Sequence, residues 1–250
     1  MRDPLDTYDD ARRQAEEAAF IASHPGYDAE TIAMLRATEY ARFDATGATY
    51  LDHTGAGVYA ASQVARHHEV LAEGVFGNPH SHNPSALAST ALVERARAAV
   101  LEHLNADPAE YDVVFTGNAS GALKLVGEAF PFSRASTYVL LYDNHNSVNG
   151  IREFARRAGA RTVYVPVRPP ELRLDADLLE RALAEPCSPD APRLFAYPAQ
   201  SNFSGVQHPL EWVEHARSLG WRTVLDAAAF LPTNRLDLSQ VKPDFLPISF

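Results

Sequence analysis

Residues 111–130 read Tyr-Asp-Val-Val-Phe-Thr-Gly-Asn-Ala-Ser-Gly-Ala-Leu-Lys-Leu-Val-Gly-Glu-Ala-Phe. The apolar run at 112–115 is typical of a short strand, and apolar side chains recur at helical spacing over residues 119–129. A helix that starts directly after such a turn has unpaired backbone N–H groups, which favour a phosphate together with the positive end of the helix dipole. The stretch therefore predicts either a phosphate-binding turn or a plain strand–turn–helix joint.

Three residues of this turn have properties that suit an anion site. Gly117 allows the backbone to approach a ligand closely, and Asn118 is the non-glycine residue that best tolerates a left-handed conformation. Ser120 suits either a helix cap or a bond to a phosphate oxygen. The residue types alone do not separate these two roles of Ser120.

Composition limits the classes of function. The chain has 250 residues, 46% of them hydrophobic, a formal net charge of -10 and one cysteine, Cys187. The negative charge argues against a nucleic-acid partner, and a single cysteine suits a reducing compartment. The acidic N-terminus lacks the apolar core of a signal peptide, and no run is long enough to span a membrane. We expect a cytoplasmic protein.

Apolar runs alternate with helical patterns over most of the chain. Two helices, at 8–22 and 28–38, are expected to form an N-terminal helical arm over residues 1–44. A larger domain over residues 45–250 follows. Its predicted strands lie at 49–52, 112–115, 137–142, 161–166, 193–197, 222–226 and 244–249. This alternation predicts an α/β fold with a mostly parallel sheet covered by helices on both faces.

Polar side chains follow five of the strands predicted from residue 112 onward. In parallel sheets the ligand lies beyond the carboxyl ends of the strands, so these side chains are expected to meet at one edge. The residues are Ser120, His145, Asn202, Asp226 and Ser249. Their convergence is the strongest indication of a binding site.

Asp226 lies in the apolar segment 223–230, where a carboxylate loses most of its solvation and needs a cationic partner. The protonated ring nitrogen of pyridoxal phosphate is such a partner, although a structural carboxylate would fit the same pattern. His145 suits stacking on a flat ring, a role as a base, or capping of the next helix. Asn202 suits a bond to a phenolate oxygen or an ordinary turn.

The histidines suggest a rival interpretation, a metal-dependent hydrolase. His80 and His82 resemble a metal-binding pair, with His53 and His145 as further ligands. The surrounding sequence lacks the Asp, Glu or Cys residues that would complete such a site, so no metal is expected. Cys187 has no activating base near it in sequence and is interpreted as incidental.

Seven phrases occur in order along residues 45–250. They are Tyr-Leu-Asp-His-Thr-Gly-Ala at 50–56, Gly-Asn-Pro-His-Ser at 77–81, Phe-Thr-Gly-Asn-Ala-Ser-Gly-Ala-Leu-Lys-Leu at 115–125, Asp-Asn-His-Asn-Ser at 143–147, Gln-Ser-Asn-Phe-Ser-Gly at 200–205, Leu-Asp-Ala-Ala-Ala-Phe at 225–230 and Asp-Phe-Leu-Pro-Ile-Ser at 244–249. Together they resemble the class V aminotransferase group of pyridoxal-phosphate enzymes of fold type I, which includes the cysteine desulfurases. Within that group the closest likeness is to the N-terminal sulfurase-like domain of the molybdenum cofactor sulfurases.

The resemblance implies roles for the matching positions. Ala119, Ser120 and Ser249 would hold the phosphate of pyridoxal 5'-phosphate. His145 would stack on the ring, Asn202 would approach the ring hydroxyl, and Asp226 would pair with the ring nitrogen. The resemblance also implies a homodimer, with cysteine or another small amine as the substrate. His145 and Asp226 would be the catalytic residues.

Three departures from the family pattern affect the mechanism. Ala229 replaces a glutamine that desulfurases usually have, and Asn118 replaces the usual glycine of the phosphate turn. The Schiff-base lysine of the family would follow the last matched strand, whereas the only lysines are Lys124 and Lys242. We therefore expect that this chain is the front of a longer enzyme whose C-terminal part is missing, and that the chain is inactive alone.

The resulting hypothesis is the N-terminal portion of an enzyme that cleaves the C–S bond of cysteine and transfers sulfur through a persulfide. Cys187 does not replace the mobile cysteine of the desulfurases. The alternatives are an aminotransferase or lyase of the same fold, and a truncated, non-catalytic homologue that acts as a scaffold.

Overall fold

The computed structural model describes residues 9–53, 55–186, 188 and 190–249. The chain forms two compact units, one of Met1–Leu51 with Tyr59–Gly74 and one of Asp52–Val58 with Val75–Phe250. The predicted division into 1–44 and 45–250 stays a prediction. Thr54 and Cys187, which the sequence analysis named, lie outside the described residues.

The first unit consists of helices α1 (Asp10–Ser23), α2 (Ala29–Glu39), α3 (Arg42–Thr46) and α4 (Ala61–Glu73). Aspartate side chains cap the first two helices. Asp9 accepts from the Ala11 and Arg12 backbone N–H groups, and Asp28 accepts from Thr31 N–H at 2.9 Å. Glu39 joins α2 to α4 because its carboxylate accepts from Ser62 N–H at 2.9 Å.

The strand predicted at 49–52 is wrong. This segment has no strand pairing, and the Leu51 side chain is 85% exposed. A strand needs a neighbour for its backbone groups, and the described chain supplies none here. The helix α3 was not predicted because five residues are too few to give a clear periodic pattern.

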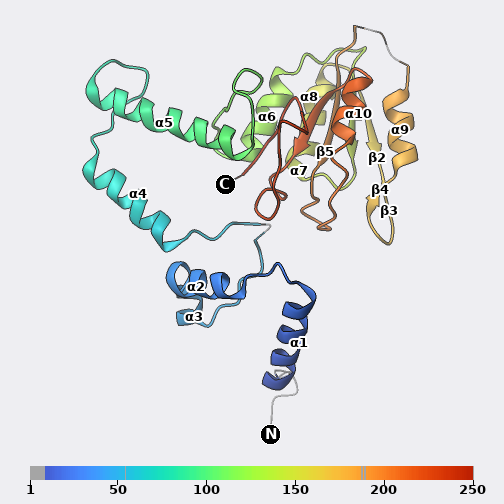
Figure 1. Ribbon diagram of the computed structural model, residues 1–250. Helices are drawn as coiled ribbons and strands as arrows, with labels where there is room; N and C mark the ends of the chain where they lie inside the picture. Colours follow the sequence, from blue (N-terminus) through green and yellow to red (C-terminus); the bar gives the residue numbers. More distant parts are fainter. Residues whose placement is uncertain (1–8, 54, 187, 189, 250) are drawn as a thin grey trace. The chain divides into compact units, whose positions relative to one another are not determined.

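The second unit contains a four-stranded parallel sheet. Its strands are β1 (Thr137–Leu141), β2 (Arg161–Val165), β5 (Arg193–Pro198) and β6 (Arg222–Asp226), in the order β2-β1-β5-β6 (Figure 1). A separate antiparallel pair joins β3 (Val167–Arg168) to β4 (Arg173–Leu174). The helices of this unit are α5 (Pro84–His103), α6 (Ala119–Ala129), α7 (Asn146–Asn149), α8 (Ile151–Arg157), α9 (Ala176–Ala184) and α10 (Trp212–Ser218).

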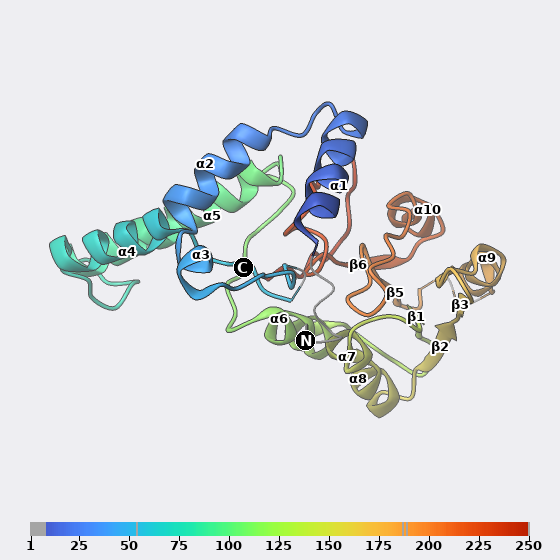
Figure 2. The same cartoon turned by 90° about the horizontal axis from the view of Figure 1, so that it is seen from below.

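Helices cover both faces of the sheet (Figure 2). Tyr138 and Leu140 of β1 pack with residues of α6, α7 and α8, whereas Val139 and Leu141 pack with residues of α9 and α10. Every residue of β1 is buried, which explains why its sequence is a continuous apolar run. The predicted α/β fold with a covered parallel sheet is confirmed.

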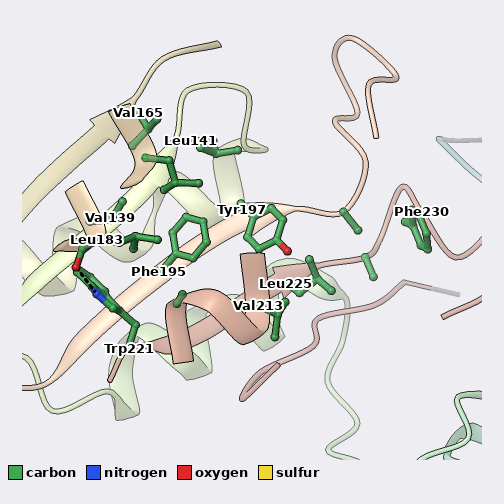
Figure 3. Packing of buried hydrophobic residues seen from close by; sticks show 14 of the residues in the cluster. Val139, Leu141, Val165, Leu183, Phe195, Tyr197, Val213, Trp221, Leu225 and Phe230 are labelled. Atoms are coloured by element: carbon green, nitrogen blue, oxygen red, sulfur yellow. Dashed lines mark hydrogen bonds between the residues drawn. The ribbon is translucent and has the colours of Figure 1, made fainter. Parts of the chain in front are cut away.

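Figure 3 shows the core on the α9 and α10 side. The rings of Phe195 and Tyr197 stack with centroids 4.9 Å apart. Trp221, at the amino end of β6, donates from its indole N–H to the Leu183 carbonyl at 3.0 Å. The buried polar atom of the tryptophan is therefore paired, which lets this large ring fill the core.

The two remaining predicted strands have different outcomes. Residues 245–247 run parallel beside β6, with Phe245 and Pro247 accepting from the Leu225 and Ala227 N–H groups at 3.0 and 3.1 Å. The strand predicted at 112–115 is absent, since this segment pairs with no strand in the described chain. Val114 is accordingly 63% exposed.

None of the helices in the described ranges is both long and apolar enough to cross a membrane.

We predict that Gly127→Ala destabilises the second unit. A Cβ atom at Gly127, in α6, would lie 2.6 Å from a Phe154 ring carbon. The overlap outweighs the better helix propensity of alanine, so the free energy of unfolding in urea should fall by about 1–2 kcal/mol. In a Phe154→Leu background the same Gly127→Ala change should cost clearly less. Equal costs in both backgrounds would contradict the packing argument.

Candidate functional site

Four loops and helix starts that carry polar residues lie at the carboxyl edge of the parallel sheet. β1 leads into α7, β5 leads into a turn over residues 199–208, and β6 ends at Asp226. The N-terminus of α6 joins this edge through contacts with α7. The sheet topology thus brings together segments that are far apart in sequence.

Asn118 caps α6, and Ser120 does not. The Asn118 side-chain oxygen accepts from Gly121 N–H at 2.8 Å, and its φ of -176° is extended backbone. Asn118 therefore does not use the left-handed conformation that it tolerates, and of the two roles left open for Ser120 the cap is filled by Asn118. Asparagine is among the best N-cap residues because its short side chain reaches the helix N–H groups.

The hydroxyl of Ser120 is therefore available for another contact. It bonds the hydroxyl of Ser147, at the start of α7. His145 caps α7, because its Nδ1 accepts from Ser147 N–H at 3.2 Å and lies 3.0 Å from Ser147 Oγ. A neutral His145 ring then carries its proton on Nε2. The starts of α6 and α7 are thus linked by the contacts Ser120–Ser147–His145.

Asp226 ends β6, and only 7% of it is exposed. Its Oδ1 accepts from Ala228 N–H at 3.0 Å. Burial raises the pKa of the Asp226 carboxyl, and the Ala228 hydrogen bond and the nearby His145 act in the opposite direction. Burial is the largest of these causes, so this carboxylate is ionised only at a cost that a cationic ligand would remove.

Ala119 is the first residue of α6, where backbone N–H groups are free of intrahelical partners. Asn202 lies exposed in the 199–208 turn, and Ser249 lies exposed beyond the segment that pairs with β6. In the part of the chain described, no hydrogen bond joins Asn202 or Ser249 to His145 or Asp226. The structure thus links Ser120 to His145 and places His145 close enough to act on Asp226.

A buried pair at the same edge was missed by the sequence analysis. His208 Nε2 lies 2.7 Å from Asp143 Oδ2, and their side chains are 1% and 3% exposed. Asp143 belongs to the Asp-Asn-His-Asn-Ser phrase, but nothing in its sequence indicates a partner 65 residues away. Only the neighbouring positions of β1 and β5 bring the two together.

The other candidate residues do not join this site. No group of three or more His, Cys, Asp or Glu side chains within residues 9–53, 55–186, 188 and 190–249 is arranged to hold a metal ion. Lys124 pairs with Glu128 at 3.3 Å and is 67% exposed, and Lys242 pairs with Glu110 at 2.6 Å. Both lysines form pairs typical of surface helices and loops.

The family profile described as Aminotransferase class-V matches residues 49–250. The chain belongs to this family. It is 40% identical over 240 residues to the molybdenum cofactor sulfurase of Bos taurus and 39% identical over 242 residues to that of Homo sapiens. Each match covers 90% of this chain but only 27% and 26% of the relative, so the chain spans about a quarter of their length.

Solved cysteine desulfurases share the fold. The enzyme from Escherichia coli aligns with a TM-score of 0.69 and 23% identity, over 86% of this chain and 53% of that one. The enzyme from Thermococcus onnurineus aligns with a TM-score of 0.72 and 23% identity, over 85% and 51%. The resemblance drawn from the sequence is therefore confirmed: the chain belongs to the class V aminotransferase family and is similar to molybdenum cofactor sulfurases and, in fold, to cysteine desulfurases.

Enzymes of this family depend on pyridoxal phosphate, and the residues of the site fit such a group. The start of α6 offers backbone N–H groups and the Ser120 hydroxyl to an anion. Asp226 offers a buried carboxylate whose ionised form needs a cation. His145 offers a flat ring whose Nδ1 is already fixed by Ser147. Donors for a phosphate and a partner for a protonated ring nitrogen thus occur in one site.

We predict that Asp226→Asn removes a pH dependence of stability. Because burial raises the pKa of Asp226 above 3.8, the folded chain binds its proton more tightly than the unfolded chain. The free energy of unfolding therefore falls as the pH rises from 3.8 to the folded pKa, and is level above it. Asparagine does not titrate, so the variant does not lose stability in this way. In urea titrations from pH 4 to 8, the free energy of unfolding of the variant relative to the parent chain should rise and then level off. A pH-independent difference would contradict this assignment.

Proposed function

We propose that this chain forms the pyridoxal-phosphate-binding portion of an enzyme that cleaves the C–S bond of cysteine and passes the sulfur on as a persulfide. The observation that carries the proposal is the contact series Ser120–Ser147–His145 beside the buried carboxylate of Asp226. It combines hydrogen-bond donors for an anion, a flat ring and a buried carboxylate at one sheet edge, in a chain whose relatives are named molybdenum cofactor sulfurases.

The phosphate would be held at the start of α6. Ala119 and Ser120 contribute helix N–H groups, and the Ser120 hydroxyl adds a side-chain donor. Because Asn118 already caps the helix through Gly121, Ser120 can exchange its Ser147 contact for a phosphate oxygen without uncapping α6. We assign Ser249 to the same phosphate on the basis of the family pattern.

The ring would lie between His145 and Asp226. Bound pyridoxal phosphate supplies an electron sink for bond cleavage at the substrate's carbon atoms. Asp226 would hold the proton on the ring nitrogen, since a cation there offsets the burial that raises the carboxyl pKa. His145, whose Nδ1 is bonded to Ser147 N–H, would stack on the ring, and Asn202 would donate to the ring hydroxyl.

The two lysines do not suit the role of the amine nucleophile. Lys124 points to solvent beside Glu128, and Lys242 contacts Glu110. We therefore propose that this 250-residue chain binds the cofactor reversibly and does not catalyse alone. The same observation favours the alternative of a non-catalytic scaffold over an aminotransferase or lyase. The cytoplasmic location, the homodimer and the small amine substrate stay predictions.

We predict that the chain binds pyridoxal 5'-phosphate and that Ser120→Ala and Asp226→Asn each weaken binding about tenfold or more, because each removes a bond to a charged group. Equilibrium dialysis measures the dissociation constants. Lys124→Ala, on the exposed side of the same helix, is the matched control and should bind like the parent chain. Unchanged affinity in both site variants would refute the assignment.

We predict that borohydride reduction of the chain with bound cofactor leaves no adduct on Lys124 or Lys242, because both side chains are engaged with glutamates outside the site. Peptide mass spectrometry detects the adduct, and sulfide release from cysteine is assayed in parallel. No sulfide is expected, with a complete cysteine desulfurase as the positive control. A lysine adduct together with sulfide release would overturn the proposal that this chain is inactive alone.

A further inference from the structure

The buried Asp143–His208 pair takes no part in the site as described so far. Their side chains are almost fully buried, and His208 Nε2 lies 2.7 Å from Asp143 Oδ2. Since a carboxylate only accepts, the proton of this bond belongs to Nε2 of the imidazole. Asp143 Oδ1 and His208 Nδ1 have no hydrogen-bond partner in the described chain. The pair is thus held by one short, directional bond.

Each member lies close in sequence to a predicted cofactor-binding residue. Asp143 is two residues before His145, in the segment that joins β1 to α7, which we call the β1 loop (residues 142–147). His208 ends the turn over residues 199–208, which we call the β5 turn and which carries Asn202. β1 and β5 are hydrogen-bonded neighbours in the sheet and lie side by side in Figure 2. The pair therefore connects the two segments that carry the ring-binding residues.

The β5 turn is a narrow hairpin. His208 N–H donates to the Ala199 carbonyl at 3.0 Å, and Ser201 N–H donates to Val206 at 2.9 Å. Gly205 N–H closes the tip by donating to the Ser201 carbonyl at 2.9 Å. The His208 side chain thus sits at the base of the hairpin, while Asn202 lies toward its tip. A bond that fixes the base of the hairpin therefore also sets the direction of its tip.

One further bond joins the same two segments, and another joins the β1 loop to strand β5. The Ser201 hydroxyl donates to the Asp143 carbonyl at 3.2 Å, and the Asn144 side chain donates to the Ala196 carbonyl of β5 at 3.1 Å. Ser201 is completely buried, and Asn144 and Asp143 are nearly so. Hydrogen bonds shielded from water in this way are not readily replaced by hydrogen bonds to solvent. Two links therefore fix the β1 loop against the β5 turn, and a third fixes it against β5 itself.

A stability role alone does not account for this arrangement. Buried charged or polar pairs contribute little net stability compared with apolar side chains of similar volume, because both groups lose their hydration. What such a pair does provide is a defined direction, since the bond is lost when the groups rotate or separate. The neighbouring core is instead filled by apolar contacts, such as the stacked rings of Tyr197 and Phe195 in β5.

We propose that Asp143 and His208 are positioning residues for the cofactor site: their bond holds the β1 loop against the β5 turn, so that His145 and Asn202 face the same ring. The inference rests on the proposed function, because the ring is that of pyridoxal phosphate. It assigns roles to two residues that do not touch the cofactor. His145 is then fixed twice, through Ser147 at its own ring and through Asp143 in its backbone.

The test compares three variants of the full 250-residue chain. Asp143→Leu/His208→Leu removes the bond without leaving a buried charge, so the fold is retained. His208→Gln keeps a side-chain N–H donor for Asp143 and is the rescue variant. Trp221→Phe is the control, because it removes a buried hydrogen bond at the amino end of β6, away from the site. Urea unfolding confirms that each variant folds.

Two readouts are taken on each variant. Amide hydrogen exchange is followed at Ser147 and Gly205, whose N–H groups bond within the β1 loop and the β5 turn. The dissociation constant of pyridoxal 5'-phosphate is measured by dialysis. The double leucine variant should exchange about tenfold faster at both amides and bind about tenfold more weakly, as expected for one lost hydrogen bond. His208→Gln and Trp221→Phe should match the parent in both readouts.

The outcomes separate the two proposals. Unchanged exchange in the double variant overturns the inference, and so does faster exchange with unchanged cofactor affinity, because the pair would then be structural only. If Trp221→Phe weakens cofactor binding as much as the double variant, general destabilisation explains the effect and the inference also falls. Failure of the unsubstituted chain to bind pyridoxal 5'-phosphate refutes the proposed function itself and is read from the parent chain alone.

Discussion

The arrangement of the second unit depends on one constraint, the burial of a parallel sheet on both faces. Because β1 and β5 are almost completely buried, their backbone groups must pair with neighbouring strands, and the polar residues can occur only where the strands end. Parallel strands end at the same edge. Burial of the core therefore determines where a site can form, independently of what the site binds.

At that edge, the loops are tied to one another by side-chain hydrogen bonds. Ser120 contacts Ser147 across α6 and α7, and Asp143 contacts His208 across the β1 loop and the β5 turn. The first link is exposed and uses hydroxyl groups that can rearrange around a ligand. The second is buried and directional. The site thus combines an exposed contact that can adapt to a ligand, Ser120–Ser147, with a buried, rigid contact, Asp143–His208. Preorganised binding sites require such rigid support.

The sequence predicted the sheet and most of its helices because apolar periodicity is a local property of β1, β5 and α6. It also singled out Ser120, His145 and Asp226, since polar residues after predicted strands are visible in sequence, and their roles in binding stay predictions. It left Ser120 open between a helix cap and a phosphate contact, because Ser and Asn have similar cap preferences and only the helix geometry shows that Asn118 is the cap. The Asp143–His208 bond was not predictable, because it arises from strand order.

The charge of Asp226 links the fold to the proposed chemistry. The packing of β6 in the sheet core places the carboxyl where burial raises its pKa, and the Ala228 N–H and His145 only partly compensate. The folded chain therefore carries a local electrostatic cost that a protonated ring nitrogen would remove on binding. In the proposed site, part of the affinity for such a ring would follow from the fold itself, before any contact with phosphate is counted. Such a site would favour a flat, cationic heterocycle over a neutral one, because only the cation offsets the burial of the carboxylate.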